Sequence, residues 1–281
     1  MKTKRGLLVA AALLVAAGCG VAAYAGWSGT SGSGAGEDSS PPASRVDKPV
    51  PKSLLHKLRK ASEAGLDYAQ APQSNHFKLI SGPRVTSGSK VGVFYLGADF
   101  CPYCAGQRWP LLLTLMRFGH FRGIRYMLSS SDDVYPDTVT FTFYKSHYRS
   151  DYIDFIPVEV RDREGKPLQS PTPQQRKIYS RFDAPPYAQS TGGIPFVYID
   201  GQYVLTRPLL MAADIQHMDW KQVTAELEKR DSALFRKLMP RVNLFTAVLC
   251  RMDGGKPDKV CSAPGVAAAN GKLATMQMTG E

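Results

Sequence analysis

The sequence predicts an α/β fold in which a central mixed sheet is flanked by helices. Residues 90–96 form an apolar, β-rich run that leads through a short turn into a helix-like run over residues 105–118. Residues 196–205 predict a β-hairpin, because Asp200-Gly201 separates two β-rich runs. Strands and helices that follow one another in this way predict one main domain built on a sheet.

The turn between the first strand and its helix holds a CxxC motif, Cys101-Pro102-Tyr103-Cys104. The strand would place Cys101 at the end of the sheet, where the free N–H groups and positive dipole end of the helix face its sulfur. This setting favours a thiolate, so Cys101 is predicted to attack and Cys104 to resolve the mixed disulfide. Pro102 and Tyr103 are predicted to tune the pair at the substrate-binding surface, since proline has no N–H to donate and the tyrosine hydroxyl can donate. The alternative is a static structural disulfide, which the flanking strand and helix make the weaker interpretation.

A proline precedes the hairpin, in Ile194-Pro195. The peptide bond before proline is the one setting where the cis form costs little, and we predict a cis bond here. Pro195 is predicted to lie against the cysteine pair, and the backbone of Ile194 to pair with an extended client peptide as an added strand. The plainer role for this proline is to turn the chain into the hairpin.

The order of strand, CxxC, helix, strand, connection, proline-led hairpin and final helix resembles the thioredoxin superfamily. More narrowly, residues 97–109 and Phe118-Gly119 look like a group of membrane-anchored, thioredoxin-like proteins classed under a domain of unknown function. The resemblance covers about residues 90–230. It implies a thioredoxin-like sheet and the same attacking and resolving roles for Cys101 and Cys104, and it says more about fold than about substrate.

Two positions depart from the thioredoxin pattern. Cytosolic thioredoxins have a buried carboxylate six residues before the first cysteine, and Tyr95 stands at that position here. Pro110, which is expected to kink the helix, lies one residue later than the usual spacing. Efficient thioredoxin-like reduction is therefore not implied by the resemblance.

The remaining elements follow from periodicity and start signals. Thr172-Pro173 with Gln175 predicts the start of a helix, as does Asp219 with Gln222. Residues 124–129 are predicted to be the next parallel strand of a right-handed βαβ unit. The other expected elements are a helix over 54–68, a strand over 77–80, extra strands inserted before the hairpin over 138–144 and 153–160, a helix over 172–182, a helix from 219 that Pro240 ends, and a C-terminal helical extension over 242–252.

The first 27 residues differ in kind from the rest, since basic residues precede an uncharged apolar stretch. Three interpretations stay open: a retained transmembrane helix, a cleaved signal peptide using Ala23-Tyr24-Ala25, and lipid modification at Cys19. All three place the rest of the chain outside the cytoplasm. Residues 28–53 predict a flexible linker, residues 54–266 the folded domain and residues 267–281 a loose tail.

The chain has five cysteines, of which Cys250 and Cys261 remain once the CxxC pair and Cys19 are set aside. In an oxidising compartment they are predicted to form a structural disulfide that closes the loop between them. A second redox-active pair and a zinc site built from all four cysteines of the domain are the other possibilities. The zinc site is disfavoured, because a second close-spaced ligand pair is missing.

Other polar residues near the motif give weaker signals. Asp99 is predicted to be a rim residue that raises the thiol pKa slightly, while Arg108 and Trp109 could lower it or line a groove. The histidines form no close pair in the sequence, so no metal site is predicted, and no cofactor is expected. They are His56, His76, His120, His147 and His217. The formal charge of +11 comes from dispersed residues, which predicts a solvated surface and no nucleic-acid partner.

Together these patterns predict an extracytoplasmic thiol-disulfide oxidoreductase that forms mixed disulfides with client proteins. Its expected partners are clients with thiols or disulfides, a membrane or soluble redox recycling partner, and the membrane itself through the N-terminal segment. The rival interpretation is a non-catalytic binding module on a thioredoxin scaffold, for envelope interaction or copper delivery, whose CxxC is a static disulfide.

Overall fold

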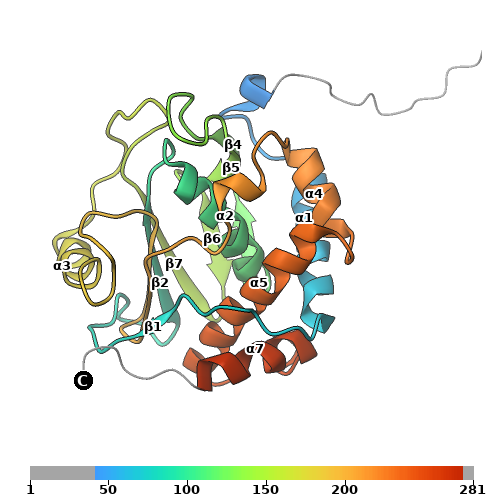
Figure 1. Ribbon diagram of the computed structural model, residues 1–281. Coiled ribbons are helices and arrows are strands. Elements are labelled where there is room, and N and C mark those ends of the chain that lie inside the picture. The colour runs from blue at the N-terminus through green and yellow to red at the C-terminus, as the bar shows by residue number, and fades with distance from the viewer. Residues whose placement is uncertain (1–41, 275–281) are drawn as a thin grey trace, which may run out of the picture. The chain divides into compact units, whose positions relative to one another are not determined.

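A mixed sheet packs between helices in the computed structural model of the protein, which describes residues 42–274 (Figure 1). Its strands are β1 (Lys78–Leu79), β2 (Val91–Gly97), β3 (Gly119–Arg122), β4 (Arg125–Leu128), β5 (Val139–Thr142), β6 (His147–Ser150), β7 (Ile153–Glu159), β8 (Phe196–Ile199) and β9 (Tyr203–Leu205). Its α-helices are α1 (Lys52–Ala64), α2 (Pro102–Met116), α3 (Pro173–Phe182), α4 (Trp220–Glu228), α5 (Ala233–Met252), α6 (Asp258–Cys261) and α7 (Pro264–Ala274). Short 3₁₀ turns are η1 (Pro42–Arg45), η2 (Gly65–Asp67) and η3 (Ala212–Asp214).

Strand β2 lies inside the main sheet, whose strand order in the described part of the chain is β1-β9-β8-β2-β7. It pairs in parallel with β7 and antiparallel with β8, so Tyr95 faces Pro157 on one side and Val197 on the other. All seven residues of β2 are buried. The strand that leads to the CxxC motif is therefore paired on both edges.

The partner of β2 corrects the sequence prediction for this region. Strand β4 is not its parallel neighbour, because β4 pairs antiparallel with β5 in a separate two-stranded sheet. The parallel neighbour is β7, which was expected to be an extra strand. Between α2 and β7, strands β3 to β6 form two small two-stranded sheets. Local β propensity located these strands, but pairing depends on contacts between distant segments.

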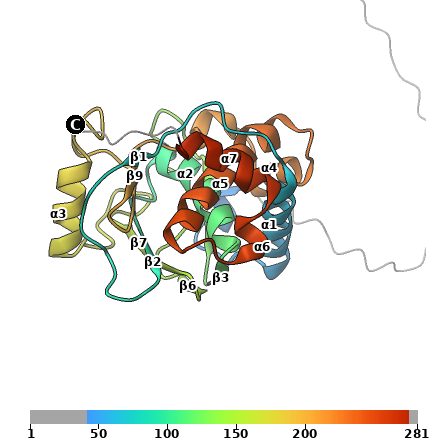
Figure 2. The same ribbon diagram turned by 90° about the horizontal axis from the view of Figure 1, so that it is seen from below.

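Alternation along β2 divides the core into two layers. Val91, Val93 and Tyr95 point into the larger cluster with α1, α2, α4, α5 and α7, whereas Phe94 and Leu96 point into a smaller one. Helix α3 covers that smaller cluster with Ile178 and Phe182. Figures 1 and 2 show α3 alone on its side of the sheet, with the other labelled helices on the opposite side.

Several local predictions are confirmed. Asp200 and Gly201 turn the β8–β9 hairpin with positive φ angles of 41° and 87°. The Thr172 hydroxyl caps α3 and Gln175 returns the capping bond, while Asp219 and Gln222 do the same for α4. These signals depend on a few adjacent residues, which is why they could be identified from sequence.

The prediction for the C-terminal helices was wrong at two points. Pro240 does not end a helix, because it lies inside α5, and the break falls after α4, where the Ser232 hydroxyl caps the new helix. Residues 267–274 are not a loose tail, since they belong to α7, which buries Val266, Ala269 and Leu273. The small side chains of this segment suggested a loose tail, but small side chains also allow α7 to pack closely against α5.

The predicted domain start also needs correction. Residues 42–53 were assigned to a flexible linker, yet Pro49 forms a β-bridge with Arg125, the first residue of β4, and Val50 is buried. None of the helices within residues 42–274 is long and apolar enough to cross a membrane. The predicted anchor or signal over residues 1–27, and Cys19 within it, lie outside the described residues.

Candidate active site

Cys101 is the N-cap residue of α2, which begins at Pro102, three residues before the predicted start. Its Sγ atom accepts a hydrogen bond from the backbone N–H of Cys104, with a donor–acceptor distance of 3.3 Å. The side chain thus takes up one of the N–H groups that a helix leaves free at its N-terminus. Both cysteines are unbonded thiols in this structure, and both are buried. We call the pair the dithiol.

The two thiols have opposite electrostatic settings. The hydrogen bond from the Cys104 thiol is the main reason that the pKa of Cys101 is lowered, and it outweighs the effect of burial. Burial raises the pKa of Cys104 well above its ordinary value, and its bond to Cys101 adds to this. Cys101 is therefore the thiol that ionises first, as a nucleophile followed by a resolving cysteine requires.

The Ile194–Pro195 bond is cis, which confirms the prediction. The Cys101 thiol points at the carbonyl oxygen of Ile194, with a sulfur–oxygen distance of 3.8 Å. Ile194 is partly buried and packs against the apolar cluster formed by the dithiol and Ala98. The structure thus brings together Cys101, Cys104 and the Ile194–Pro195 segment, which lie far apart in the sequence.

The loop before this proline is held by two residues of the α3 region that the sequence analysis did not single out. The Asp183 carboxylate accepts the backbone N–H of Gly193 at 2.6 Å, and the Tyr179 hydroxyl donates to the carbonyl of Gly193 at 2.9 Å. Burial raises the pKa of the Asp183 carboxyl. A tyrosine and an aspartate four residues apart at a helix end give no recognisable signal, because their role depends on the distant loop.

Arg108 follows Cys104 by one helical turn in α2 and is fully buried. Its guanidinium makes two hydrogen bonds to Glu159 at 2.9 and 2.7 Å, and a third to Asp99 at 3.3 Å. We call these three residues the charged cluster. The prediction that Asp99 is a rim residue was wrong, since its exposed fraction is 1%.

The proposed groove-lining roles of Arg108 and Trp109 are also wrong. Trp109 is fully buried and donates its indole N–H to the carbonyl of Val139. The missed signal was the single arginine in an otherwise uncharged helix, together with Glu159 at the end of an apolar strand. Charged residues in such buried positions are almost always paired with each other.

Tyr95 occupies the core beside the charged cluster. The Arg108 guanidinium lies 6.0 Å from the centre of its ring, and burial raises the pKa of the phenol well above the ordinary value. Its hydroxyl and the Nη1 atom of Arg108 are buried without a hydrogen-bond partner in the described structure. Two unpaired polar atoms inside one core are unusual, because each costs free energy when buried.

The family described as "Domain of unknown function (DUF929)" matches residues 76–251. The chain belongs to the DUF929 family. The matched range spans the dithiol, the charged cluster and the Ile194–Pro195 bond. A search among the curated proteins and a search among the solved structures each found no match.

Two surface cavities of this DUF929 protein are lined by residues close in sequence to Cys101 or to Ile194. One of about 420 Å³ includes Phe100, the residue before Cys101, and is lined mostly by charged side chains of the 130–133 and 161–165 loops. The other, of about 520 Å³, includes Gly193 and residues of the 74–78 and 186–190 segments. Tyr103 makes an edge contact with Tyr135, with ring centres 6.1 Å apart. Residues next to the buried dithiol, Phe100 on one segment and Gly193 on the other, therefore line two separate surface cavities.

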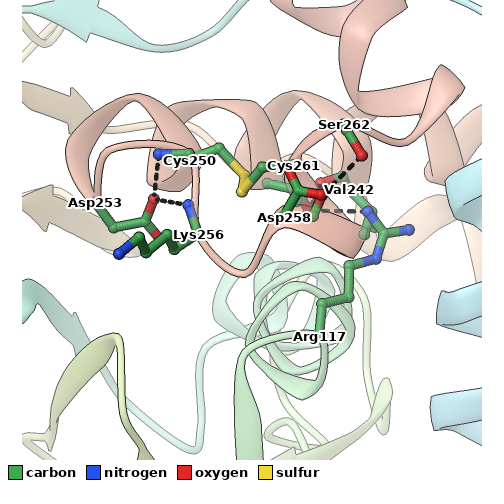
Figure 3. The surroundings of a disulfide bond; sticks show 10 residues. Arg117, Val242, Cys250, Asp253, Lys256, Asp258, Cys261 and Ser262 are labelled. Atoms are coloured by element: carbon green, nitrogen blue, oxygen red, sulfur yellow. Dashed lines mark hydrogen bonds between the residues drawn. A yellow bond between two sulfur atoms is a disulfide. The ribbon is translucent and has the colours of Figure 1, made fainter.

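The C-terminal cysteines are joined by a disulfide, as Figure 3 shows. Their Cα atoms are 5.6 Å apart, and the bond links the end of α5 to α6. The loop between them is folded around Asp253, whose carboxylate accepts the backbone N–H of Lys256 at 2.9 Å. Within residues 42–274 no group of three or more His, Cys, Asp or Glu side chains is arranged to hold a metal ion.

Proposed function

We propose that this DUF929 protein is a thiol-disulfide oxidoreductase that acts outside the cytoplasm. The single observation that supports this most strongly is the placement of Cys101, whose sulfur caps α2 and lies 3.8 Å from the Ile194 carbonyl next to a cis proline. A low-pKa thiol at a helix N-terminus, followed one turn later by a second cysteine, is the arrangement that disulfide exchange uses.

The strand order supports a thioredoxin-like reading of the fold. The strand before the CxxC motif lies between a parallel strand, β7, and the antiparallel strand that follows the cis proline, β8. The CxxC helix and the cis-proline loop meet at the same end of these strands. This is the order that the resemblance to the thioredoxin superfamily implies, with the β3–β6 stretch as an insertion after α2.

The exchange proceeds in two substitutions at sulfur. The Cys101 thiolate attacks a client disulfide, forms a mixed disulfide, and releases one client sulfur as a thiolate. Cys104 then loses its proton and attacks Cys101, which releases the second client sulfur and leaves the Cys101–Cys104 disulfide. The client gains two electrons in this direction and loses two when the same steps run backwards.

Clients are proposed to lie across the surface beside Cys101. The partly buried side chains of Phe100, Tyr103 and Ile194 surround the dithiol with apolar surface. The backbone of Ile194 can pair with an extended client segment. A client would therefore be recognised by its extended backbone and its accessible cysteine more than by a particular amino-acid sequence. A recycling partner, in the membrane or soluble, would restore the dithiol or disulfide. The apolar N-terminal segment is proposed to anchor the protein to the membrane or to direct its export.

The test is the reduction potential of the dithiol, measured by equilibrating the full chain in glutathione buffers and trapping free thiols, with Cys101→Ser as the control. A value above about −200 mV would assign the protein as a donor of disulfides, and one below about −250 mV as a reductase. If the pair exchanges with neither glutathione nor a disulfide client, the proposed function is wrong.

A further inference from the structure

Arg117, which follows the last residue of α2, is a second buried arginine whose surroundings differ from those of Arg108. Its exposed fraction is 7%. Its guanidinium donates to the hydroxyl and the carbonyl of Ser62 at 3.0 and 2.7 Å, and to the side chains of Asn243 and Thr246 at 2.8 Å each. All of these partners are neutral, whereas Arg108 bonds two carboxylates. The positive charge of Arg117 is therefore buried without a counter-charge among the groups that it bonds, which costs free energy.

The guanidinium of Arg117 also has one donor to spare. An arginine side chain has five N–H groups, and the bonds above use Nε once, Nη1 twice and Nη2 once. The second N–H of Nη2 has no partner among the described residues. Burial lowers the pKa of Arg117 to about 9, an effect that the exposed Glu63 carboxylate offsets only in part. The side chain is thus still positive at neutral pH, and a bound anion would stabilise it.

Arg117 lines a cavity of about 830 Å³ between α1, η2, α6 and the start of α7. This volume lies within the range of about 300–1,000 Å³ that is usual for small-molecule sites. Lys60, Glu63, Asp67 and Lys259 are exposed residues of the lining, and their two positive and two negative charges balance. The charge that is left over is that of the buried arginine. The apolar part of the lining consists of Ala64, Leu66, Pro257, Val260, Ala263 and Pro264.

The start of α7 adds positive potential at the same cavity. Ala263, which precedes the helix, and Pro264, its first residue, both line the cavity. Alanine has no polar side-chain atom that could cap the free N–H groups of the first turn. The helix has 11 residues, so its N-terminal end carries partial positive charge. A buried guanidinium and a helix start without a side-chain cap therefore border one opening, and both favour an anion.

The cavity is remote from the dithiol. Cys101 caps the start of α2 and Arg117 caps its end, which places them about 24 Å apart along the helix axis. Figure 3 shows Arg117 reaching from this end of α2 toward α5, where Asn243 accepts its hydrogen bond. A ligand in the cavity would therefore leave Cys101 uncovered.

We propose that this cavity binds a small organic carboxylate with an apolar body, whose carboxylate pairs with Arg117 and whose body lies against the apolar lining. The carboxylate supplies the missing counter-charge and accepts the spare N–H of Nη2, and hydrogen bonds between these two ions are among the stronger ones in proteins. The apolar walls favour a ligand that has more than a charged group. The inference concerns a second site and does not depend on the proposed function.

Equilibrium dialysis with naphthalene-2-carboxylate tests the site. The full chain is held in vesicles of zwitterionic lipid, and vesicles without protein serve as the blank. We expect saturable binding of the carboxylate. The neutral naphthalene-2-carboxamide has nearly the same shape but no charge, so it should bind more weakly on the order of 10-fold or more. Equal affinity for the two compounds, or no binding above the blank, would overturn the proposal.

Ser262→Trp blocks the cavity without changing Arg117. Ser262 is exposed, lines the cavity and donates its hydroxyl to the carbonyl of Asp258. The indole should occupy the opening and weaken binding of the carboxylate. Gly271→Trp is the matched control, because Gly271 is exposed on α7, lies outside the lining, and has nothing within 4 Å of an added Cβ. It should leave the affinity unchanged. Equal affinity in the two variants would contradict binding in this cavity.

Arg117→Met tests the charge itself. It should remove the preference for the carboxylate over the carboxamide, while weak binding of both compounds remains because the apolar walls are kept. Arg59→Met is its control, since Arg59 donates to the carbonyls of Met116 and Gly119 beside the same end of α2 but does not line the cavity. It should keep the full preference. A folded Arg117→Met protein that keeps the preference overturns the role of Arg117, and Ser262→Trp decides the matter if that variant does not fold.

Competition distinguishes two sources of such a ligand. Octanoate stands for a water-soluble acid, and oleate added to the vesicles stands for an acid that reaches the site from the membrane. Displacement of naphthalene-2-carboxylate by octanoate alone supports a soluble ligand, and displacement by oleate supports a fatty acid. Displacement by neither would contradict a site for organic carboxylates. Exchange of the dithiol with glutathione should be the same with and without ligand, so failure of this inference and failure of the proposed function are seen separately.

Discussion

The thiol of Cys101 lies 3.8 Å from the carbonyl oxygen of Ile194, a residue 93 positions further along the chain. Cys101 follows the central strand β2 and caps α2, and Ile194 precedes a cis proline just before the neighbouring strand β8. Because β2 and β8 pair along their lengths, the distance between these two atoms is set by the sheet. The predictions below depend on this placement.

The two cysteines should be separable by substitution. Cys104→Ser removes the resolving thiol, so a mixed disulfide with a client should accumulate and be visible as a covalent complex on a non-reducing gel. Cys101→Ser should give no such complex, because the buried Cys104 thiol has a raised pKa. Equal trapping by both variants would contradict the assigned roles.

Alkylation of the dithiol should depend on pH in an asymmetric way. The lowered pKa of Cys101 means that its thiolate forms at lower pH than that of an ordinary cysteine, so its alkylation rate should reach half its maximum at a lower pH than the rate of an unstructured cysteine peptide. Cys104 should remain unmodified in the native protein. Mass spectrometry after brief alkylation at several pH values measures both, and a guanidinium-unfolded sample serves as the reference.

Asp183→Ala should impair client exchange without affecting the reactivity of Cys101 toward a small reagent. The substitution removes the acceptor of the Gly193 N–H and frees the loop that presents Ile194. We expect kcat/KM for a peptide disulfide to fall by about 10-fold, the equivalent of about 1.4 kcal/mol. Tyr179→Phe, which removes the second bond to Gly193, should give a smaller effect in the same direction. Slower reaction with the small reagent as well would point to a general loss of structure.

Replacing both Cys250 and Cys261 by alanine should lower the free energy of unfolding by about 2–3 kcal/mol, because the disulfide closes a loop across a sequence separation of 11. Urea unfolding of the two proteins under non-reducing conditions measures the difference. Exchange by the dithiol should persist at a temperature where both proteins are folded. A loss of exchange there would indicate a redox role for this second pair.

Arg108→Met should be strongly destabilising, by about 3–5 kcal/mol near pH 8, because Asp99 and Glu159 would remain buried without their counter-charge. The pKa of Asp99 is raised from 3.8 to about 7 in the folded protein. Folded protein therefore binds more protons than unfolded protein between these values, and stability falls as pH rises from about 4 to 7.

Without Arg108, the cost of burying the ionised Asp99 carboxylate should grow. The loss in free energy of unfolding caused by Arg108→Met should therefore be largest above pH 7 and should shrink toward pH 4. Urea unfolding at the two pH values measures it. Arg84→Met is the matched control, since Arg84 pairs with Asp200 but is half exposed, and it should cost about 1 kcal/mol or less at both.

Sequence patterns located the local elements well where a few adjacent residues decide the outcome. The capping residues of α3, the Asp200-Gly201 turn and the start of α4 are of this kind. Pro240 shows the limit of such signals, because a proline usually ends a helix but lies within α5 here. Burial of the α5 face against α2 and α7 offsets the lost hydrogen bond, and that packing involves distant segments.

For the candidate site, the sequence by itself determined the CxxC motif, its position between a strand and a helix, and the proline that precedes the hairpin. These features depend on residue identity and short-range spacing. Only the tertiary structure decided that β7 is the parallel partner of β2, that Asp183 holds the Gly193 loop, and that Asp99 and Glu159 meet at Arg108. The sequence shows which of these residues carry a charge. It does not show which of them are buried or paired, because that depends on which distant segments the sheet and helices bring together.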